Sequence, residues 1–242
     1  MRINKDSHAF TIFFTFAVTL VLVFPLTLAY VTTKPIADNY WRLQHWVKTL
    51  KSLGISADPA HPHQAEEAYK ALKKYTVKGT VDYNAVKANP RSLAITRVND
   101  EVINKALQDT SYTGNLPIFF YSTVVDGQKR WAGDFTGPGL WGNVSLAVGV
   151  NSDGSQITGV QVLFDVETPG LGGRIGEPWF TDQFKGLQTA SGVVFNPSGQ
   201  KLSNGMDAIA GATITSTAVR DILNNRALIL LRAFIAQKGG QS

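Results

Sequence analysis

The sequence contains no cysteine and few charged residues. Without thiols, the chain can form no disulfide, thiolate-held iron–sulfur cluster, zinc ribbon or cysteine nucleophile. The net charge of +5 is spread along the chain, without the arginine clusters that nucleic-acid binding requires. Charged residues make up 17% of the 242 residues, whereas about 25% is usual in soluble domains. This deficit predicts an apolar segment joined to an ordinary domain, and we expect no nucleic-acid partner.

Histidine is also scarce, which limits metal binding and hydrolysis. The four histidines are His8, His45, His61 and His63, all before the strand-rich half of the chain. A serine or threonine hydrolase would need a histidine base and an orienting acid near its nucleophile, and no G-x-S-x-G turn is present. The pair His61 and His63 supplies too few ligands for a metal site. We therefore expect neither a conventional hydrolase nor a metal centre.

The apolar segment runs from Ala9 to Val31 without a charged residue. About 20 such residues are enough for a helix that spans a bilayer. The alternative is a cleaved signal peptide, for which Thr27-Leu28-Ala29 offers a small-x-small site, but the run exceeds the usual 7–15 residues or so. Basic residues flank both ends, so charge does not determine the orientation. The pattern favours an uncleaved transmembrane helix over residues 9–31.

The residues after this segment show the periodicities of an α+β domain with a mainly antiparallel sheet flanked by helices. Residues 39–53 form an amphipathic pattern that suits either the membrane headgroups or packing on the domain itself. Hairpin signals occur at Asp126-Gly127 and in the stretch NSDGS. The patterns predict further helices at 64–74, 98–108, 181–187 and 216–237, and strands at 117–125, 129–135, 143–150, 156–164 and 192–195.

Two glycine-rich elements are candidates for ligand binding. The stretch Glu167–Gly173 reads ETPGLGG and lacks both the G-x-G-x-x-G spacing and the P-loop signature, so composition alone also fits an ordinary surface turn. The stretch Asp207–Thr217 reads DAIAGATITST and precedes the C-terminal helix, for which Thr215 or Ser216 is the predicted N-cap. The N-terminus of that helix favours a phosphate beside Thr213, although a capped loop of small residues has the same composition.

These elements together resemble the FMN-binding domain family, whose flavinylation motif is D-x-x-(S/T)-G-A-T. Members include the C subunit of the Na+-translocating NADH:quinone oxidoreductase (Nqr) and the G subunit of the Rnf complex. Residues 207–216 resemble that motif, Glu167–Gly172 resembles a loop about 40 residues upstream, and Gly137–Gly142 resembles the G-x-G-L-W element of the Nqr protein. The resemblance covers the anchor and residues 133–242, whereas residues 54–130 match no motif of the family.

The resemblance implies FMN joined through its phosphate to Thr213, a phosphoester made by a separate flavin transferase with FAD as donor. The residues it implies for cofactor binding are Leu140, Trp141, Glu167, Thr168, Pro169, Gly170, Leu171, Gly172, Asp207, Gly211, Ala212 and Thr215. Glycines at 170 and 172 would allow close backbone contact with the flavin. Leu140 and Trp141 suit either cofactor packing or the core. Ala210 stands where the family usually has Ser or Thr, which we expect to cost a hydrogen bond near the phosphate but not the attachment.

The resemblance also implies an organisation and a cellular role. Residues 1–8 would form a short cytoplasmic tail, 9–31 the transmembrane helix, 32–130 a connecting helix and the first part of an extracytoplasmic domain, and 131–242 the FMN-binding core. The chain would sit in a bacterial inner membrane with its domain in the periplasm and pass electrons alongside other membrane subunits. Two alternatives stay open: an FMN carrier of another extracytoplasmic electron-transfer system, or a non-redox membrane-tethered scaffold.

Overall fold

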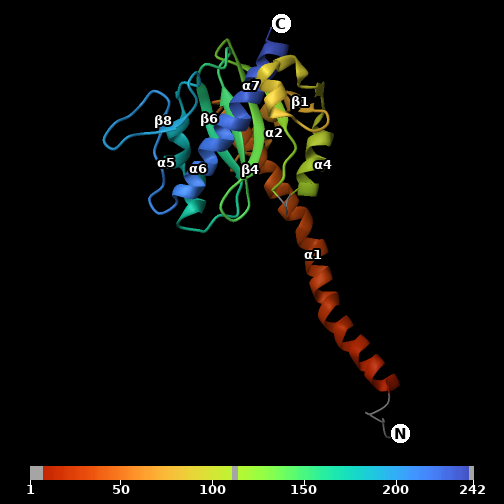
Figure 1. Cartoon of the computed structure of the whole chain (residues 1–242). Helices are drawn as coiled ribbons and strands as arrows, with labels where there is room; N and C mark the ends of the chain where they lie inside the picture. The colour runs from red at the N-terminus through yellow and green to blue at the C-terminus, as the bar shows by residue number, and fades with distance from the viewer. Residues whose placement is uncertain (1–7, 111–113, 240–242) are drawn as a thin grey trace. The chain divides into compact units, whose positions relative to one another are not determined.

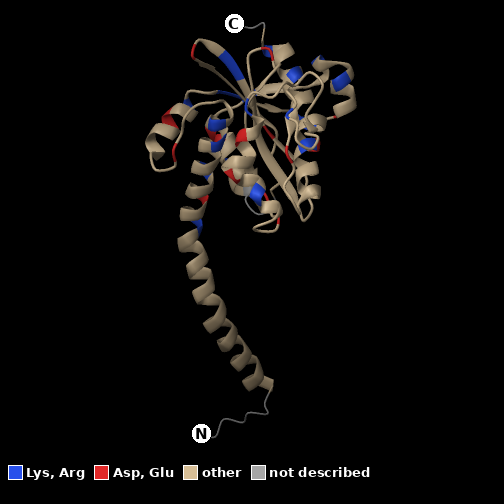
Figure 2. Ribbon diagram, turned by 90° about the vertical axis from the view of Figure 1, so that its left-hand side faces the viewer, with Lys and Arg blue, Asp and Glu red and all other residues tan. Residues whose placement is uncertain are grey.

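The structure is a computed structural model that describes residues 8–110 and 114–239. The chain divides into two units, residues 1–41 and 42–242, which are described separately. In the first unit, helix α1 (His8–Ser52) carries an exposed apolar segment that is long and apolar enough to cross a membrane. In Figure 2 the ribbon of this segment is tan, the colour of residues other than Lys, Arg, Asp and Glu. Threonine hydroxyls bond back to the helix here, as Thr33 does to the Ala29 carbonyl at 2.7 Å.

Residues 39–52 of the amphipathic stretch belong to α1, which passes through Pro25 and Pro35 and ends at Ser52. Within the second unit, its final turns are buried at Trp46, Val47 and Leu50. Of the two alternatives for the amphipathic pattern, packing on the domain is therefore the one observed for these residues. The side chains of these three residues point into a core, whereas Tyr40 and Trp41 earlier in the stretch are exposed.

The second unit is built on a six-stranded antiparallel sheet in the order β2-β1-β3-β4-β5-β6 (Figure 1). The strands are β1 (Lys73–Val77), β2 (Ile95–Arg97), β3 (Phe119–Val125), β4 (Gln128–Pro138), β5 (Asn143–Val150) and β6 (Ile157–Phe164). The short strands β7 (Val194–Phe195) and β8 (Gly205–Met206) form a separate parallel pair. The α+β class and the antiparallel sheet are thus confirmed. The predicted start of the FMN-binding core at residue 131 lies inside β4.

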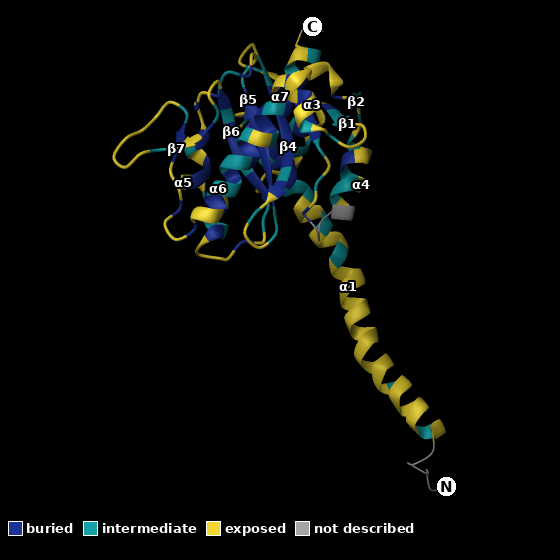
Figure 3. Cartoon of the chain, viewed as in Figure 1, coloured by how far each residue is buried: buried dark blue, intermediate teal, exposed yellow. Residues whose placement is uncertain are grey.

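Helices cover both faces of this sheet, because its central strands are apolar on both sides. On β3, Phe119 and Tyr121 belong to one core cluster while Phe120 between them belongs to the other. One cluster packs under the end of α1, α2 (Pro62–Lys70) and α4 (Asp100–Thr110). The other packs under α3 (Tyr83–Ala88), α6 (Thr213–Ile222), the π-turn η4 (Leu223–Ala227) and α7 (Leu228–Lys238). Figure 3 shows the central strands β4 and β5 as mostly buried.

Several predicted boundaries were wrong. The predicted helix at 216–237 begins at Thr213 and is interrupted by the π-turn. The predicted helix at 181–187 is instead α5 (Pro178–Thr181) followed by the 3-10 turn η3 (Asp182–Phe184), and the predicted strand at 192–195 shortens to β7. The helix predicted at 64–74 ends at Lys70, because β1 begins at Lys73 and pairs with β3. The remaining 3-10 turns are η1 (Pro90–Ser92) and η2 (Gly172–Gly176).

Candidate functional site

The turn between β4 and β5 presents two large apolar side chains to solvent. The Gly139 N–H donates to the Gly142 carbonyl at 2.6 Å and closes the turn. Leu140 is 47% exposed and Trp141 is 69% exposed. Exposed apolar side chains side by side on one turn are typical of a binding surface. Leu140 and Trp141 are therefore not part of the core, which was the alternative interpretation of these two residues.

The loop after β6 turns sharply at a glycine. The Thr168 carbonyl accepts from the N–H groups of Leu171 and Gly173, at 3.1 and 3.0 Å. Gly170 has a φ of 77°, a conformation that other residues rarely adopt. A Cβ on Gly172 would lie 2.6 Å from Thr215 Oγ1 and 2.9 Å from Glu167 Oε2. Gly172 therefore allows this loop to approach α6 closely.

The third element is the segment that leads into α6. Gly211 has a φ of 78°, and the Ala212 N–H donates to the Ile209 carbonyl at 3.0 Å. The N-cap of α6 is Ala212, which supplies no side-chain cap, so the prediction of Thr215 or Ser216 as N-cap was wrong. Both lie buried inside the first turns, where Ser216 Oγ accepts from the Ile209 N–H at 3.0 Å. The first N–H groups of α6 are consequently left without a side-chain acceptor.

One buried carboxylate joins these three elements. Glu167 Oε1 accepts from the N–H groups of Leu140 and Trp141 at 2.9 and 3.1 Å. Its other oxygen, Oε2, accepts from the Thr215 hydroxyl at 2.5 Å. Only 5% of Glu167 is exposed. Because a buried carboxylate needs such donors, this residue fixes the relative positions of the turn, the loop and α6.

The three elements enclose a pocket of about 270 Å³. Its lining residues are Leu140, Glu167, Thr168, Leu171, Gly172, Gly211, Ala212, Thr213, Ile214 and Thr215. Thr213 is exposed at the start of α6, and among the described residues its hydroxyl has no hydrogen-bond partner. Leu171 and Ile214 are also exposed, at 48% and 60%. The pocket thus combines an apolar rim, free backbone donors and two exposed threonines, Thr168 and Thr213, of which Thr213 stands at the start of α6.

Most of the predicted cofactor-binding residues meet at this pocket, and four do not line it. Trp141 stands beside it on the turn, and Pro169 and Gly170 form the tip of the neighbouring loop. Asp207 faces away: its carboxylate accepts from Asn196 Nδ2 at 2.8 Å and its N–H donates to Gln183 Oε1 at 2.6 Å. Ala210 is exposed, beside the loop and not in the lining.

Sequence reasoning missed one lining residue, Ile214. A β-branched apolar residue that follows Thr213 directly was interpreted only as part of a small-residue loop. Its exposure in the first turn of α6 identifies Ile214 as a lining residue. This can be recognised only when the start of the helix is known. The prediction placed this boundary three residues too late.

These features fit a flavin phosphate. A helix N-terminus without a side-chain cap is a ready anion site, and α6 has 10 residues to supply the dipole. Exposed apolar side chains on the rim suit a planar ring, and the pocket volume is slightly below the roughly 300–1,000 Å³ usual for small-molecule sites. A ligand here would therefore keep part of its surface exposed.

Comparison with known proteins identifies the region. A family model for the FMN-binding domain matches residues 139–227. The chain is 39% identical over 112 residues to the G subunit of an ion-translocating oxidoreductase complex from Methanosarcina acetivorans, covering 45% of this chain and 57% of that protein. It is 30% identical over 143 residues to the C subunit of the Na+-translocating NADH-quinone reductase of Vibrio alginolyticus, covering 56% and 54%.

A solved structure shows the same fold. The C subunit of the Na+-translocating NADH-quinone reductase from Parabacteroides distasonis superposes with a TM-score of 0.56 and 25% identity, covering 81% of this chain and 92% of that one. By sequence, the chain spans about half the length of the curated relatives named above. Residues 139–227 therefore match the FMN-binding domain family, and the relatives of the chain include C subunits of Na+-translocating NADH-quinone reductases and G subunits of ion-translocating oxidoreductase complexes.

Proposed function

We propose that this chain is a membrane-anchored electron-transfer subunit that carries FMN covalently on Thr213. It would act within an ion-translocating NADH:quinone or ferredoxin:NAD oxidoreductase, the kind of complex to which its relatives belong. One observation carries the proposal: Thr213 presents an accessible hydroxyl at the N-terminus of α6, inside a pocket built by all three motif elements. Small neighbours, Gly211 and Ala212, leave room for a bulky reactant to approach it.

The attachment step balances as a group transfer. The Thr213 hydroxyl oxygen bonds to the phosphorus of the flavin half of FAD, the bond from that phosphorus to AMP breaks, and the hydroxyl proton leaves with AMP or to water. A separate flavin transferase would catalyse this exchange. The product phosphate would lie at the first turn of α6, where the N–H groups of the helix stabilise negative charge.

Bound FMN would supply reversible one- and two-electron redox chemistry, which no side chain of this sequence provides. The chain's own residues would hold and orient it. Leu140, Leu171 and Ile214 offer apolar contact to the ring from three different elements. Glu167, in the wall of the pocket, holds those elements together. The covalent link keeps the flavin in place through each redox cycle.

We further propose that residues 9–31 span a bacterial inner membrane, with residues 1–8 in the cytoplasm and the domain, with its FMN-binding core at 131–242, on the periplasmic side. The apolar, exposed segment of α1 supports the anchor. A flavin carrier outside the cytoplasm benefits from a covalent bond, because no soluble flavin pool is at hand to replace a lost cofactor. Its partners would be the other membrane subunits of the complex.

The test is to express the full chain with and without a flavin transferase and to inspect a denaturing gel for flavin fluorescence. A fluorescent band, with a mass gain of FMN less one water, is expected only with the transferase. Thr213→Val should abolish the band, and Thr213→Ser should restore it because the hydroxyl returns. Thr217→Val, in the same helix, is the matched control and should stay fluorescent. A dark parent band with active transferase would overturn the proposal.

A further inference from the structure

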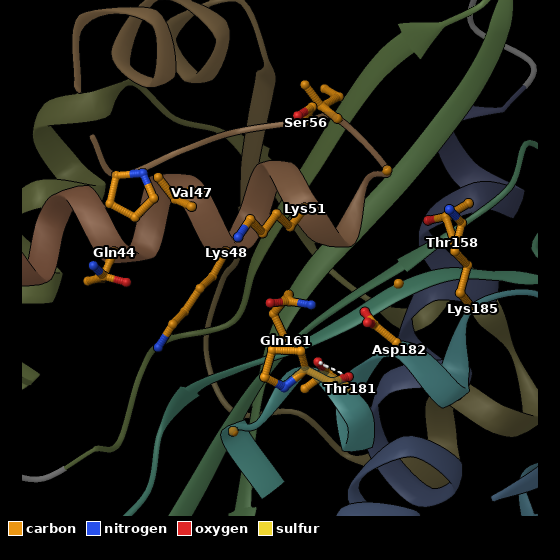
Figure 4. Close-up of a pocket in the computed structure, with 16 residues that line it drawn as sticks. Gln44, Val47, Lys48, Lys51, Ser56, Thr158, Gln161, Thr181, Asp182 and Lys185 are labelled. Atoms are coloured by element: carbon orange, nitrogen blue, oxygen red, sulfur yellow. Dashed lines mark hydrogen bonds between the residues drawn. The ribbon is translucent and has the colours of Figure 1, made fainter. Parts of the chain in front are cut away.

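A second cavity, larger than the pocket beside Thr213, lies elsewhere in the domain. It is a cleft of about 580 Å³ between the end of α1, the loop after it, β6 and the segment that contains α5 and η3. Figure 4 shows Lys48 and Lys51 of α1 on one side and Lys185 on the other, with Gln161 and Asp182 between them. The cleft shares no lining residue with the flavin pocket. It is therefore a separate site.

Among the described residues, the ammonium groups of Lys48, Lys51 and Lys185 form no hydrogen bond or ion pair. Outside the lining, Asp165 interacts electrostatically with Lys48, and Asp58 does so with Lys51. Lys48 is half-buried, and that burial lowers its pKa, with Lys51 lowering it further and Asp165 opposing the change. Asp182 is the one acidic residue in the lining. The lining therefore carries three positive charges against one negative charge, and a half-buried ammonium that would gain from an anion.

We propose that this cleft binds a small organic phosphate. Three ammonium groups match an anion with more than one negative charge and several acceptor oxygens, as a phosphate group has. Lysine binds phosphate as a point charge, whereas recognition of a planar carboxylate favours the forked arginine, and no arginine lines the cleft.

The remaining lining fits the organic part of such a ligand. Val47, Ile55, Pro59 and Pro178 provide apolar surface, and the volume lies within the range of about 300–1,000 Å³ for small-molecule sites. Gly159 in β6 and Gly176 in η2 keep the floor free of side chains. The phosphate would lie toward the lysines and the carbon skeleton along these apolar residues.

The experiment uses the full chain in detergent, with inorganic pyrophosphate as the probe and isothermal titration calorimetry at low ionic strength. The Thr213→Val variant serves as parent, so that the result does not depend on a bound flavin. Saturable binding of one pyrophosphate per chain is expected. Lys48→Gln and Lys185→Gln should each weaken it by about tenfold, the loss of one charge-assisted contact.

Lys201→Gln is the matched control, because it removes the same charge from an exposed loop outside the cleft. It should leave the affinity unchanged. Circular dichroism should show all variants folded. Absence of saturable binding, or equal weakening by Lys201→Gln and Lys48→Gln, would overturn the proposal while leaving the flavin attachment at Thr213 untouched.

A second arm identifies the source of the phosphate. Phosphatidylglycerol is added in detergent and the complex is examined by native mass spectrometry. A one-to-one lipid adduct that pyrophosphate displaces, and that Lys48→Gln weakens, assigns the cleft to a lipid headgroup. Pyrophosphate binding without such an adduct assigns it to a soluble phosphate.

Discussion

Two buried carboxylates in the second unit, Glu167 and Asp134, have very different surroundings. Glu167 lines the pocket proposed for the flavin and accepts from two backbone N–H groups and one hydroxyl of separate elements. Asp134 lies on β4 inside the core, where Tyr121 donates to it at 2.7 Å and His45 Nε2 lies 2.8 Å away. Asp134 is 1% exposed and Glu167 is 5% exposed.

The difference lies in what each carboxylate positions. Asp134 links side chains of α1, β3 and β4, and Tyr69 of α2 extends the network through a 3.4 Å contact with Tyr121. Burial raises the pKa of both tyrosines well above the ordinary value, so their hydroxyls stay protonated as donors. Asp134 thus ties α1 to the sheet, whereas Glu167 holds together the loops that form the pocket beside Thr213. Asp134 therefore stabilises the fold, whereas Glu167 positions the residues of the candidate site.

The largest effect should come from the core network. Asp134→Ala leaves the Tyr121 hydroxyl and the His45 ring without their buried partner, and should lower the free energy of unfolding by about 3 kcal/mol. Urea unfolding followed by near-ultraviolet circular dichroism measures this loss. Flavin attachment to the folded fraction should be normal, because Asp134 does not line the pocket.

A concerted apolar replacement sharpens this result. His45→Leu, Tyr121→Phe and Asp134→Val together should recover most of the lost stability, since a well-packed apolar core often replaces a buried polar network at little cost. Loss of flavin attachment in this stable variant would show that the Asp134 network also affects the site. The proposed difference between Asp134 and Glu167 would then be wrong.

The next effect should come from Glu167. Glu167→Ala removes three hydrogen bonds from a buried site, should cost about 2 kcal/mol of stability and should slow flavin attachment strongly, because the pocket elements separate. Glu167→Gln keeps an acceptor for both backbone N–H groups. Attachment should survive in that variant, with the flavin midpoint potential raised by roughly 20–30 mV because a nearby negative charge is gone.

Spectroelectrochemical titration of the attached flavin measures this potential. Glu177→Gln is the control, since Glu177 is an exposed carboxylate that pairs with Arg174 outside the pocket. An equal shift in both variants would indicate a general effect of net charge and not a local effect of Glu167.

A smaller effect tests the packing between the loop and α6. A Cβ on Gly172 would collide with the Thr215 hydroxyl and with Glu167, whereas one on Gly176 would meet nothing within 4 Å. Gly172→Ala should therefore lower stability by about 1–2 kcal/mol and reduce flavin attachment, while Gly176→Ala changes neither. Urea unfolding and gel fluorescence check both. Equal behaviour of the two variants would contradict the close approach described for Gly172.

The sequence predicted the fold class, the four long strands and the three loop elements, because each rests on a local signal. A run of aromatic and β-branched residues marks β3, the Asp126-Gly127 pair marks its hairpin, and the glycine-rich loops interrupt the pattern. It did not predict β1 and β2, because β1 pairs with β3, which lies far along the chain, and β2 is held in the sheet by β1. It also did not predict that Glu167 binds Thr215, since that contact joins residues 48 positions apart and exists only when the loop has folded onto α6.

The smallest effect on stability, and the most specific one for the site, should come from Ile214. This side chain is 60% exposed, so Ile214→Ala should change the free energy of unfolding by less than about 0.5 kcal/mol. If Ile214 covers part of the flavin ring, its removal should expose the ring, and iodide should quench flavin fluorescence more strongly than in the parent chain. Val124→Ala is the control, because Val124 is 65% exposed on β3 and does not line the pocket. Equal quenching in the Ile214→Ala and Val124→Ala variants would show that the flavin ring lies elsewhere. Glu167 would then position loops that the flavin does not contact.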